Sequence, residues 1–276
     1  MNTAIYLKRL LDDKSQVSYV TVVGQDTLSE RLVRRLDNEA LNTECIQRSD
    51  SRLVGLYAIT TDTEGERTFS YWRSESAART LFQTDQAFDF SVLAGFNVIY
   101  FSAISLAILP NEVRRAWLAE LARLRETNNV TVAFDSNYRP ALWESVETAQ
   151  EVIASAWRIT DIALPSVDDE QALFNDEDEA AVLARLRGYG ISSGALKRGV
   201  IGPLSLSSDD SDSAATQQFA SASMVVDTTA AGDSFNAGYL SAVLSGKDAA
   251  SALKAGHECA LRVIAHRGAI IPKHEW

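Results

Sequence analysis

The sequence predicts an α/β fold, in which a largely parallel sheet lies between layers of helices. Short β-branched runs alternate with stretches of helical apolar spacing along most of the chain. One pair of extended runs is joined by the turn-like segment DTEGE, which predicts an additional β-hairpin. No repeat and no long linker divides the 276 residues, so we expect a single domain over residues 1–276.

The first third of the chain alternates between helix and strand before this rhythm breaks. Apolar residues in NTAIYLKRLLDD recur near helical spacing, so we expect the chain to open directly into a helix. A buried strand is expected over 18–24 (SYVTVVG), and the following DTLSERLVRRLDNEAL has the apolar face of a helix. The extended runs 53–60 and 68–73 then form the predicted hairpin. We expect residues 53–73 to be part of a small β-lid at the edge of the sheet.

The remaining two thirds return to alternating strands and helices. The elements expected, in order, are the strand NVIYFSA, a helix over 112–127, the strand in VTVAFDSNYRP, a helix over 146–159, the segment DIALPSVDDEQALF, a helix over 179–189, the segment ALKRGV, a polar loop in DDSDSAATQQ, a strand ending at MVV and two closing helices. Repeated strand–turn–helix units favour parallel strand pairing.

Composition and charge exclude several classes of function. Lys and Arg number 26 against 37 Asp and Glu, a net charge of −11 that argues against a nucleic-acid partner. A small anionic ligand remains compatible, because it needs only two or three cations. Cys45 and Cys259 form no CxxC pair, and the three histidines lack metal-ligand spacing. No apolar run is long enough to span a bilayer and no signal-peptide pattern opens the chain, so we expect a cytoplasmic protein without a membrane partner.

The segment DTTAAGDSFNAGYL, residues 227–240, places small side chains where a strand is expected to give way to a helix. The first backbone N–H groups of a helix have no partner within the helix, and with the helix dipole they can bind an anion. Small residues at 230–232 would let a phosphate approach these groups. Asp233 could then take the proton of an attacking hydroxyl during phosphoryl transfer. The alternative is that Asp233 only stabilises the start of the helix.

Asp227–Asp233 resembles the second signature of the ribokinase/PfkB sugar kinases, Asp-Thr-x-Gly-Ala-Gly-Asp. This resemblance implies a ribokinase-like three-layer α/β/α sandwich with a small β-lid. It also implies that the backbone N–H groups of Ala231, Gly232 and Asp233 form an anion hole for the transferred phosphate, with Asp233 as general base. Ala230 stands where the family usually has glycine, a departure that costs backbone freedom.

Further segments resemble the branch of this family that phosphorylates 2-keto-3-deoxygluconate. They are GLYAITTDTEGERTFSYWRSESAA, SAISLAILP, FDSNYRPALW and HRGAIIP, and the resemblance extends from Asn2 to Pro272. It implies ATP-dependent transfer of phosphate to the 6-hydroxyl of a small anionic sugar acid. Another sugar kinase of the family, or a truncated sugar- or nucleotide-binding protein without catalysis, remains an alternative. A dinucleotide oxidoreductase is disfavoured, because the cluster at 188–193 lacks a third glycine and follows a helix.

An acidic protein that binds an anionic sugar must supply local cations, and a guanidinium matches a carboxylate with two hydrogen bonds. The resemblance places five residues at the substrate besides Asp233: Tyr57, Tyr71, Trp72, Arg73 and Arg139. The aromatic residues could instead pack on a half-exposed lid strand, and Arg139 could lie in a surface turn ahead of Pro140.

The resemblance also implies a binding site for ATP. Its expected residues are Asn137, Arg139, Lys197, Gly199, Gly202, Ala230, Ala231 and Gly232. In LKRGVIG the glycines permit close approach of the backbone, and Lys197 or Arg198 would face the phosphates. A solvated strand end is the alternative for this segment.

The family organises Mg²⁺ through water with an Asn-x-x-Glu motif, and this chain has Ser166-Val167-Asp168-Asp169 at the corresponding place. Asp169 could replace the glutamate, or Ser166 could simply cap a helix whose first turn is acidic.

The family also begins with a strand and Gly-Gly-Asp-x-x-Asn, whereas this sequence starts at the last residue of that motif, so we expect that the N-terminal strand and both glycines are missing. The resemblance further implies a homo-oligomer that forms through the lid.

Overall fold

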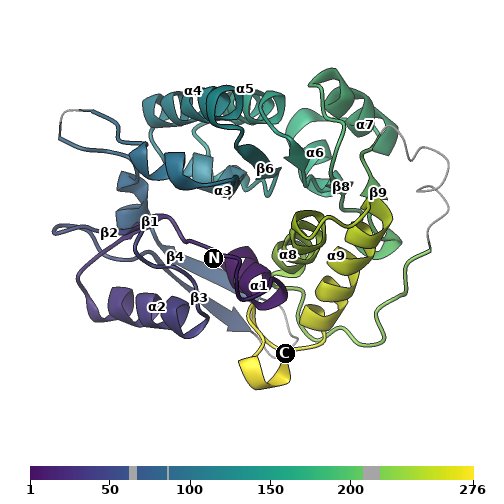
Figure 1. The fold of residues 1–276 in the computed structure, drawn as a ribbon, viewed down its shortest axis with the longest axis horizontal. Helices are drawn as coiled ribbons and strands as arrows, with labels where there is room; N and C mark the ends of the chain where they lie inside the picture. Colours follow the sequence, from purple (N-terminus) through teal and green to yellow (C-terminus); the bar gives the residue numbers. More distant parts are fainter. Residues whose placement is uncertain (62–66, 86, 208–217) are drawn as a thin grey trace.

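The computed structural model describes residues 1–61, 67–85, 87–207 and 218–276 (Figure 1). The described strands are β1 (Thr21–Val23), β2 (Ile46–Arg48), β3 (Leu56–Thr61), β4 (Arg67–Trp72), β5 (Val98–Ser102), β6 (Thr131–Asp135), β7 (Ile162–Ala163), β8 (Ala195–Leu196) and β9 (Leu204–Ser205). The α-helices are α1 (Asn2–Leu10), α2 (Thr27–Asn38), α3 (Ala103–Ala107), α4 (Asn111–Asn128), α5 (Val146–Arg158), α6 (Val167–Phe174), α7 (Glu179–Gly188), α8 (Ala231–Leu244) and α9 (Ala249–Ile264). Short 3₁₀ helices are η1 (Ala77–Thr80), η2 (Ser91–Gly95), η3 (Pro140–Leu142), η4 (Gly199–Ile201) and η7 (Lys273–Glu275).

Strands β5, β6 and β7 form a parallel sheet at the centre of the structure. A parallel bridge from Ala163 to Gly194 continues this sheet towards β8, which pairs antiparallel with β9. Such parallel order arises because a helix separates each strand from the next, as predicted from the alternation in the sequence.

Two layers of helices cover this sheet, because side chains of a strand point alternately to its two faces. Phe101 and Phe134 pack on one face with Trp117 of α4 and Trp157 of α5. Ala133 precedes Phe134 on β6, so its side chain points to the other face, where it packs with residues of α8 and α9. Helices α4 and α5 therefore lie on the opposite side of the sheet from α8 and α9 (Figure 1).

The N-terminal part brings α1 against α8 and adds two small sheets. β1 and β2 pair in parallel, apart from the central sheet in the described residues. β3 and β4 pair antiparallel from Leu56 opposite Trp72 to Thr61 opposite Arg67, so the predicted hairpin is confirmed. The DTEGE turn that was predicted to join them lies outside the described residues.

The helices expected over 112–127, 146–159 and 179–189 are confirmed within two residues at each end, as α4, α5 and α7. The strand expected to end at MVV is wrong: residues 224–226 form no strand, and all three side chains are exposed. The backbone N–H groups of Val226 and Asp227 donate to the carbonyl of Ile264, at the end of α9. The hydrogen-bond partner of this segment is therefore the end of helix α9 and not a neighbouring strand. Most of the polar loop predicted at DDSDSAATQQ lies outside the described residues.

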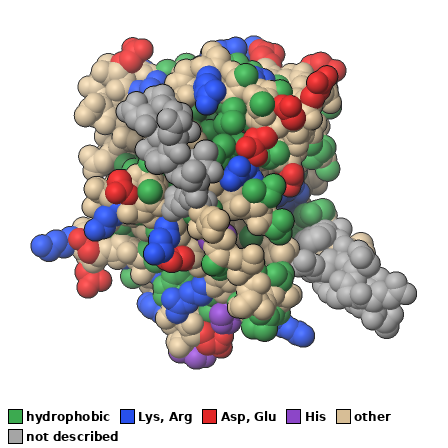
Figure 2. Space-filling view, turned by 90° about the vertical axis from the view of Figure 1, so that its right-hand side faces the viewer, with side chains coloured by type: hydrophobic (Ala, Val, Ile, Leu, Met, Phe, Trp, Pro, Cys, Tyr) green, Lys and Arg blue, Asp and Glu red, His purple; other side chains and the backbone are tan. Residues whose placement is uncertain are grey.

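Acidic and basic side chains are interspersed on the face of the molecule in Figure 2. Among the described residues, no helix has both the length and the apolar character that crossing a bilayer requires.

Candidate active site

Asp233 lies in the first turn of α8, where the N-terminus of α1 meets it. The side-chain amide of Asn2 donates to Asp233 Oδ2 at 2.9 Å, and the hydroxyl of Thr3 lies 3.1 Å from Oδ1. The two donors hold the carboxylate from one side. Asp233 thus lies in the first turn of a helix, close to N–H groups that have no partner within the helix, and its role as a base at an anion site stays a prediction.

The residue that starts α8 has an unusual backbone. Ala230 has φ 66° and ψ 16°, in the left-handed region that favours glycine. Asp227 fixes the turn before it: its carboxylate accepts from the N–H of Thr229 at 2.9 Å and from the N–H of Gly268 at 3.0 Å. This turn brings Ala231 and Gly232 into the first turn of the helix, as the resemblance implied.

A second carboxylate, Asp135, lies at the end of β6 and is almost completely buried. The ammonium of Lys197 donates to its Oδ1 at 2.7 Å, and the amide of Asn236 donates to its Oδ2 at 2.9 Å. The hydroxyl of Tyr100 lies 3.3 Å from the same Oδ2. Burial raises the pKa of Asp135, the charge and hydrogen bond of Lys197 oppose this, and the net pKa is above its usual value. The pKa of Tyr100 is raised well above its usual value, chiefly by burial.

The two carboxylates belong to one hydrogen-bonded cluster. Thr3 lies within 3.4 Å of the hydroxyl of Tyr100, which also accepts from Asn236 at 3.1 Å. Strands β5 and β6 and helices α1 and α8 therefore each contribute at least one residue, and Lys197 directly follows β8. In open parallel sheets, functional sites form at the carboxyl ends of the strands, and the end of β6 here bears a carboxylate.

Lys197 and Arg198 were alternative partners for phosphates, and the structure separates them. A Cβ built on Gly232 would lie 3.8 Å from the Lys197 ammonium, so this cation lies beside the first turn of α8. Arg198 donates instead to the carbonyl of Gly202 at 2.9 Å and lies 3.2 Å from Glu179. Gly199 and Gly202 have φ +55° and +91°, which explains why this turn carries glycines.

Arg139 and Asp169, predicted to bind different ligands, form an ion pair with each other at 3.3 Å. Arg139 remains about half exposed, and Asn137 precedes it with φ 24°. Ser166 is the N-cap of α6, and its hydroxyl accepts from the N–H of Asp169 at 3.4 Å. The capping interpretation of Ser166 is therefore confirmed.

The residues predicted to belong to a lid form a second group, on the hairpin β3–β4. Tyr57 and Tyr71 face each other across the hairpin with ring centroids 6.1 Å apart, and the Arg73 guanidinium lies 4.1 Å from the Tyr71 ring centroid. Because side chains alternate along a strand, Trp72 points to the opposite face, where Leu56 is its partner. Of the four lid residues predicted at the substrate, three thus share a face and Trp72 does not.

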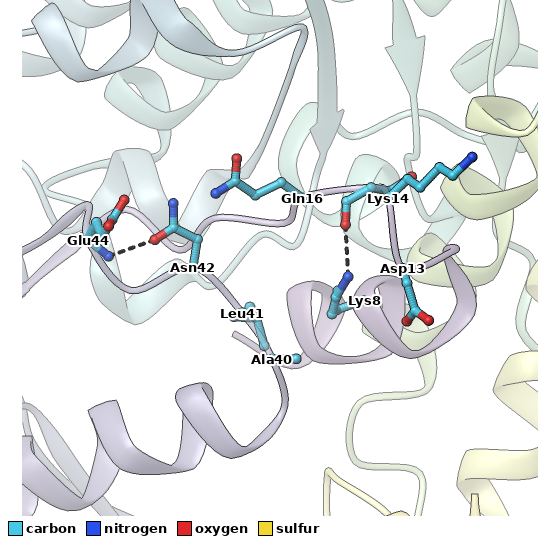
Figure 3. A pocket seen from close by; sticks show the side chains of 9 residues that line it. Lys8, Asp13, Lys14, Gln16, Ala40, Leu41, Asn42 and Glu44 are labelled. Atoms are coloured by element: carbon cyan, nitrogen blue, oxygen red, sulfur yellow. Dashed lines mark hydrogen bonds between the residues drawn. The ribbon is translucent and has the colours of Figure 1, made fainter.

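A hollow of about 360 Å³ lies at the C-terminal end of α1 (Figure 3). Lys8 already donates to the carbonyl of Ser15 at 2.8 Å, and the side-chain oxygen of Asn42 accepts from the N–H of Glu44 at 2.9 Å. Residues at the other end of α1 contact Asp233, so this hollow is separate from the site.

Sequence reasoning missed five residues of the cluster: Asn2, Thr3, Tyr100, Asp135 and Asn236. Two signals could have indicated them. Asp135 ends an apolar strand of a parallel sheet, and Asn236 follows Asp233 by three residues, on the same side of the helix. No group of three or more potential metal ligands occurs among the described residues. Mg²⁺ often binds through one or two carboxylates and the phosphates of a nucleotide, and the Asp169 carboxylate fits such a role only in part, because Arg139 occupies it.

Known proteins resemble this chain in sequence and in fold. The model of the pfkB family carbohydrate kinases matches residues 1–276. The chain is 43% identical over 274 residues to a 2-dehydro-3-deoxygluconokinase of Dickeya dadantii, covering 99% of this chain and 88% of that protein. The enzyme of the same name from Escherichia coli K12 is 41% identical over 275 residues, covering 99% and 89%.

Solved structures show the same fold. A PfkB protein from Polaromonas sp. JS666 matches with a TM-score of 0.79 and 22% identity, covering 96% of this chain and 84% of that chain. An E. coli protein provisionally assigned as a ribokinase II, solved with ATP and Mg²⁺, matches with a TM-score of 0.80 and 20% identity, covering 98% and 83%. The predicted ribokinase-like α/β fold is therefore confirmed. The chain belongs to the pfkB family of carbohydrate kinases.

Proposed function

We propose that this chain is a single kinase domain that transfers the γ-phosphoryl group of ATP to 2-dehydro-3-deoxygluconate (2-keto-3-deoxygluconate), giving the 6-phosphate and ADP. The observation that carries this proposal is the Asp233 carboxylate beside the N-terminus of α8. Relatives that are 40–43% identical over 99% of this chain bear the name of this activity, which supports the choice of substrate.

The proposed chemistry needs a base and a positive environment for the phosphoryl group. Asp233 takes the proton of the sugar 6-hydroxyl while its oxygen bonds to the γ-phosphorus and the bond to the ADP oxygen breaks. The N–H groups of Ala231, Gly232 and Asp233 receive the negative charge of the transferred group. Their position at a helix start supports this role, because they have no acceptors within α8. The N–H of Ala231 donates to the carbonyl of Thr228 at 3.2 Å, outside the helix, and would exchange this bond for one to the phosphate.

ATP is the proposed phosphate donor, with Mg²⁺ as its counter-ion. Lys197, beside Gly232, supports a phosphate site at this point. Asn137, Gly199, Gly202 and Ala230, which all have positive φ, are proposed to contribute to the ATP site. When bound, Mg²⁺ would neutralise charge on the phosphates. Asp169 is the carboxylate proposed to organise it through water, and Arg139, its ion-pair partner, is proposed to reach ATP or the sugar acid.

The lid is proposed to recognise the sugar acid with one face. Arg73 can pair with the carboxylate of the substrate, and Tyr57 and Tyr71 lie on the same face. On the opposite face, Leu56 and Trp72 are large apolar side chains that are exposed, and we place a second copy of the chain against them. Trp72→Ala should then lower the mass measured by sedimentation equilibrium without raising KM for the sugar. A raised KM at unchanged mass would instead place Trp72 at the substrate, as the resemblance implied.

A coupled assay of ADP release tests the function. The protein should turn over 2-dehydro-3-deoxygluconate with a kcat/KM well above that for fructose or ribose. Preference for a neutral sugar would favour another kinase of the family. Binding of ATP by calorimetry without release of ADP on any sugar would favour a protein that binds but does not catalyse.

A further inference from the structure

We propose that Asp135 is a positioning residue, which holds the Lys197 ammonium against the first turn of α8, where the transferred phosphoryl group would lie. The inference rests on the proposed function for that phosphoryl site. Asp135 itself is buried beneath Lys197 and touches neither ligand in the proposed reaction.

The pair is built more tightly than a surface ion pair. The side chains of Lys197 and Asp135 are 14% and 3% exposed, and the ammonium lies 2.7 Å from Oδ1. A buried charge costs free energy unless it is paired and hydrogen-bonded. Both oxygens of Asp135 meet this condition, because Lys197 binds one and Asn236 binds the other.

The same carboxylate also fixes the helix that carries the base. Asn236 follows Asp233 by three residues on α8, and its amide donates to Asp135 Oδ2 at 2.9 Å. Asp135 therefore joins the end of β6 both to the cation and to the helix. Displacing it would move the ammonium relative to the N–H groups of the anion hole.

Electrostatics explain why a carboxylate is needed here. Lys197 lies near a Cβ position on Gly232, and Asp233 is the next residue. Without Asp135, the ammonium would be drawn towards the carboxylate of Asp233, the proposed base, rather than held towards an incoming phosphate. With Asp135 in place, the cation has a fixed counter-ion and Asp233 keeps its contacts with Asn2 and Thr3.

Binding of two nucleotides tests the proposal without requiring turnover. We expect Asp135→Asn to weaken the binding of the ATP analogue AMP-PNP, measured by calorimetry with Mg²⁺, about tenfold more than the binding of ADP, since only AMP-PNP carries the γ-phosphate that the held ammonium would contact. If Asp135 only supported the fold, its substitution would weaken the binding of both nucleotides equally. A ratio of AMP-PNP affinity to ADP affinity that is the same in the variant and the wild type would therefore overturn the proposal. If Asp135→Asn does not fold, Asp135→Glu decides, because it keeps the charge but moves the carboxylate by one methylene. It should also weaken the binding of AMP-PNP more than that of ADP, and an unchanged ratio of the two affinities would overturn the proposal.

Kinetics supply a second test where the wild type is active. Lys197→Gln should lower kcat on the order of 10²-fold, and the double variant with Asp135→Asn should lose no more than this, because residues acting as a unit are not additive. If the loss of kcat in the double variant equals the product of the losses in the two single variants, the proposal is overturned.

Asp161→Asn is the matched control, because Asp161 pairs with Arg125 and accepts from the N–H of Val132 on the same strand, β6. Asp161→Asn should leave the ratio of the affinities for AMP-PNP and ADP unchanged. If the wild type releases no ADP with any sugar, the proposed function fails, while the ratio of nucleotide affinities still decides this inference.

Discussion

Asn2 donates a hydrogen bond of 2.9 Å to Asp233, which lies 231 positions further along the chain. Thr3 contacts the other carboxylate oxygen at 3.1 Å. The N-terminus of α1 thus orients the carboxylate that begins α8. Hydrogen bonds to a carboxylate are stronger than those between neutral groups, so the two contacts hold the Asp233 side chain in a defined orientation.

Asp233→Asn tests the assignment of this residue as the base. The variant keeps the size and most hydrogen bonds of the side chain but cannot accept the hydroxyl proton, so kcat should fall roughly 10²–10⁴-fold. Calorimetric binding of ATP should stay close to that of the wild type. Asp248→Asn is a control, since Asp248 caps α9 and accepts from the N–H of Ser251 at 2.8 Å, on the surface. Normal turnover by Asp233→Asn would exclude the base assignment.

The sequence allowed prediction of those features that depend on residues close together in the chain. The helix that begins with AAGD, the hairpin and the cap at Ser166 each have a local pattern, and each is present. The ion pair between Asp135 and Lys197 joins residues 62 positions apart, and it depends on which strands lie side by side. The expected strand at MVV failed for a related reason. Its apolar residues are typical of a strand, but the partner beside them is the end of α9.

Arg73→Gln should raise KM for the sugar acid roughly 10- to 100-fold, the effect of a lost charged hydrogen bond of about 1.5–3 kcal/mol. KM for ATP and the thermal midpoint should change little, because Arg73 directly follows β4 and lies against the exposed ring of Tyr71. Arg52→Gln removes a guanidinium that pairs with Glu75 at 3.3 Å and should leave KM unchanged. Equal effects of the two substitutions would contradict the role of Arg73 at the carboxylate.

Ala230→Gly should stabilise the protein by about 0.5–1 kcal/mol. An alanine in the left-handed region costs about 1–2 kcal/mol, and glycine removes most of this cost. Glycine also has greater conformational freedom in the unfolded chain, which cancels part of the gain in stability. Urea unfolding should show a higher midpoint at constant m-value. Ala184→Gly, on the exposed side of α7, makes the same change in a regular helix and should cost about 0.5–1 kcal/mol. Destabilisation of similar size in both variants would show that the φ of 66° at Ala230 carries no strain.

Glu39→Gln should lower the free energy of unfolding by about 3 kcal/mol at pH 7. Glu39 follows α2 and pairs with Arg9 of α1 through hydrogen bonds of 2.6 and 2.8 Å, with both side chains buried. Burial acts to raise the pKa of Glu39, but the hydrogen bonds and charge of Arg9, with smaller contributions from other cations, hold it below the ordinary 4.5.

This direction of the shift fixes the pH dependence. A carboxyl with a lower pKa in the folded chain than in the unfolded chain stabilises the fold above the unfolded pKa. The stabilisation is lost as the pH falls through the folded pKa. The difference in unfolding free energy between the wild type and Glu39→Gln should therefore be constant from pH 7 to about 5 and shrink below pH 4.5. Glu258→Gln, in an exposed pair with Lys254 at 3.8 Å, should show almost no difference at any pH. A difference for Glu39→Gln that persists at low pH would mean that the loss comes from packing rather than from the ion pair.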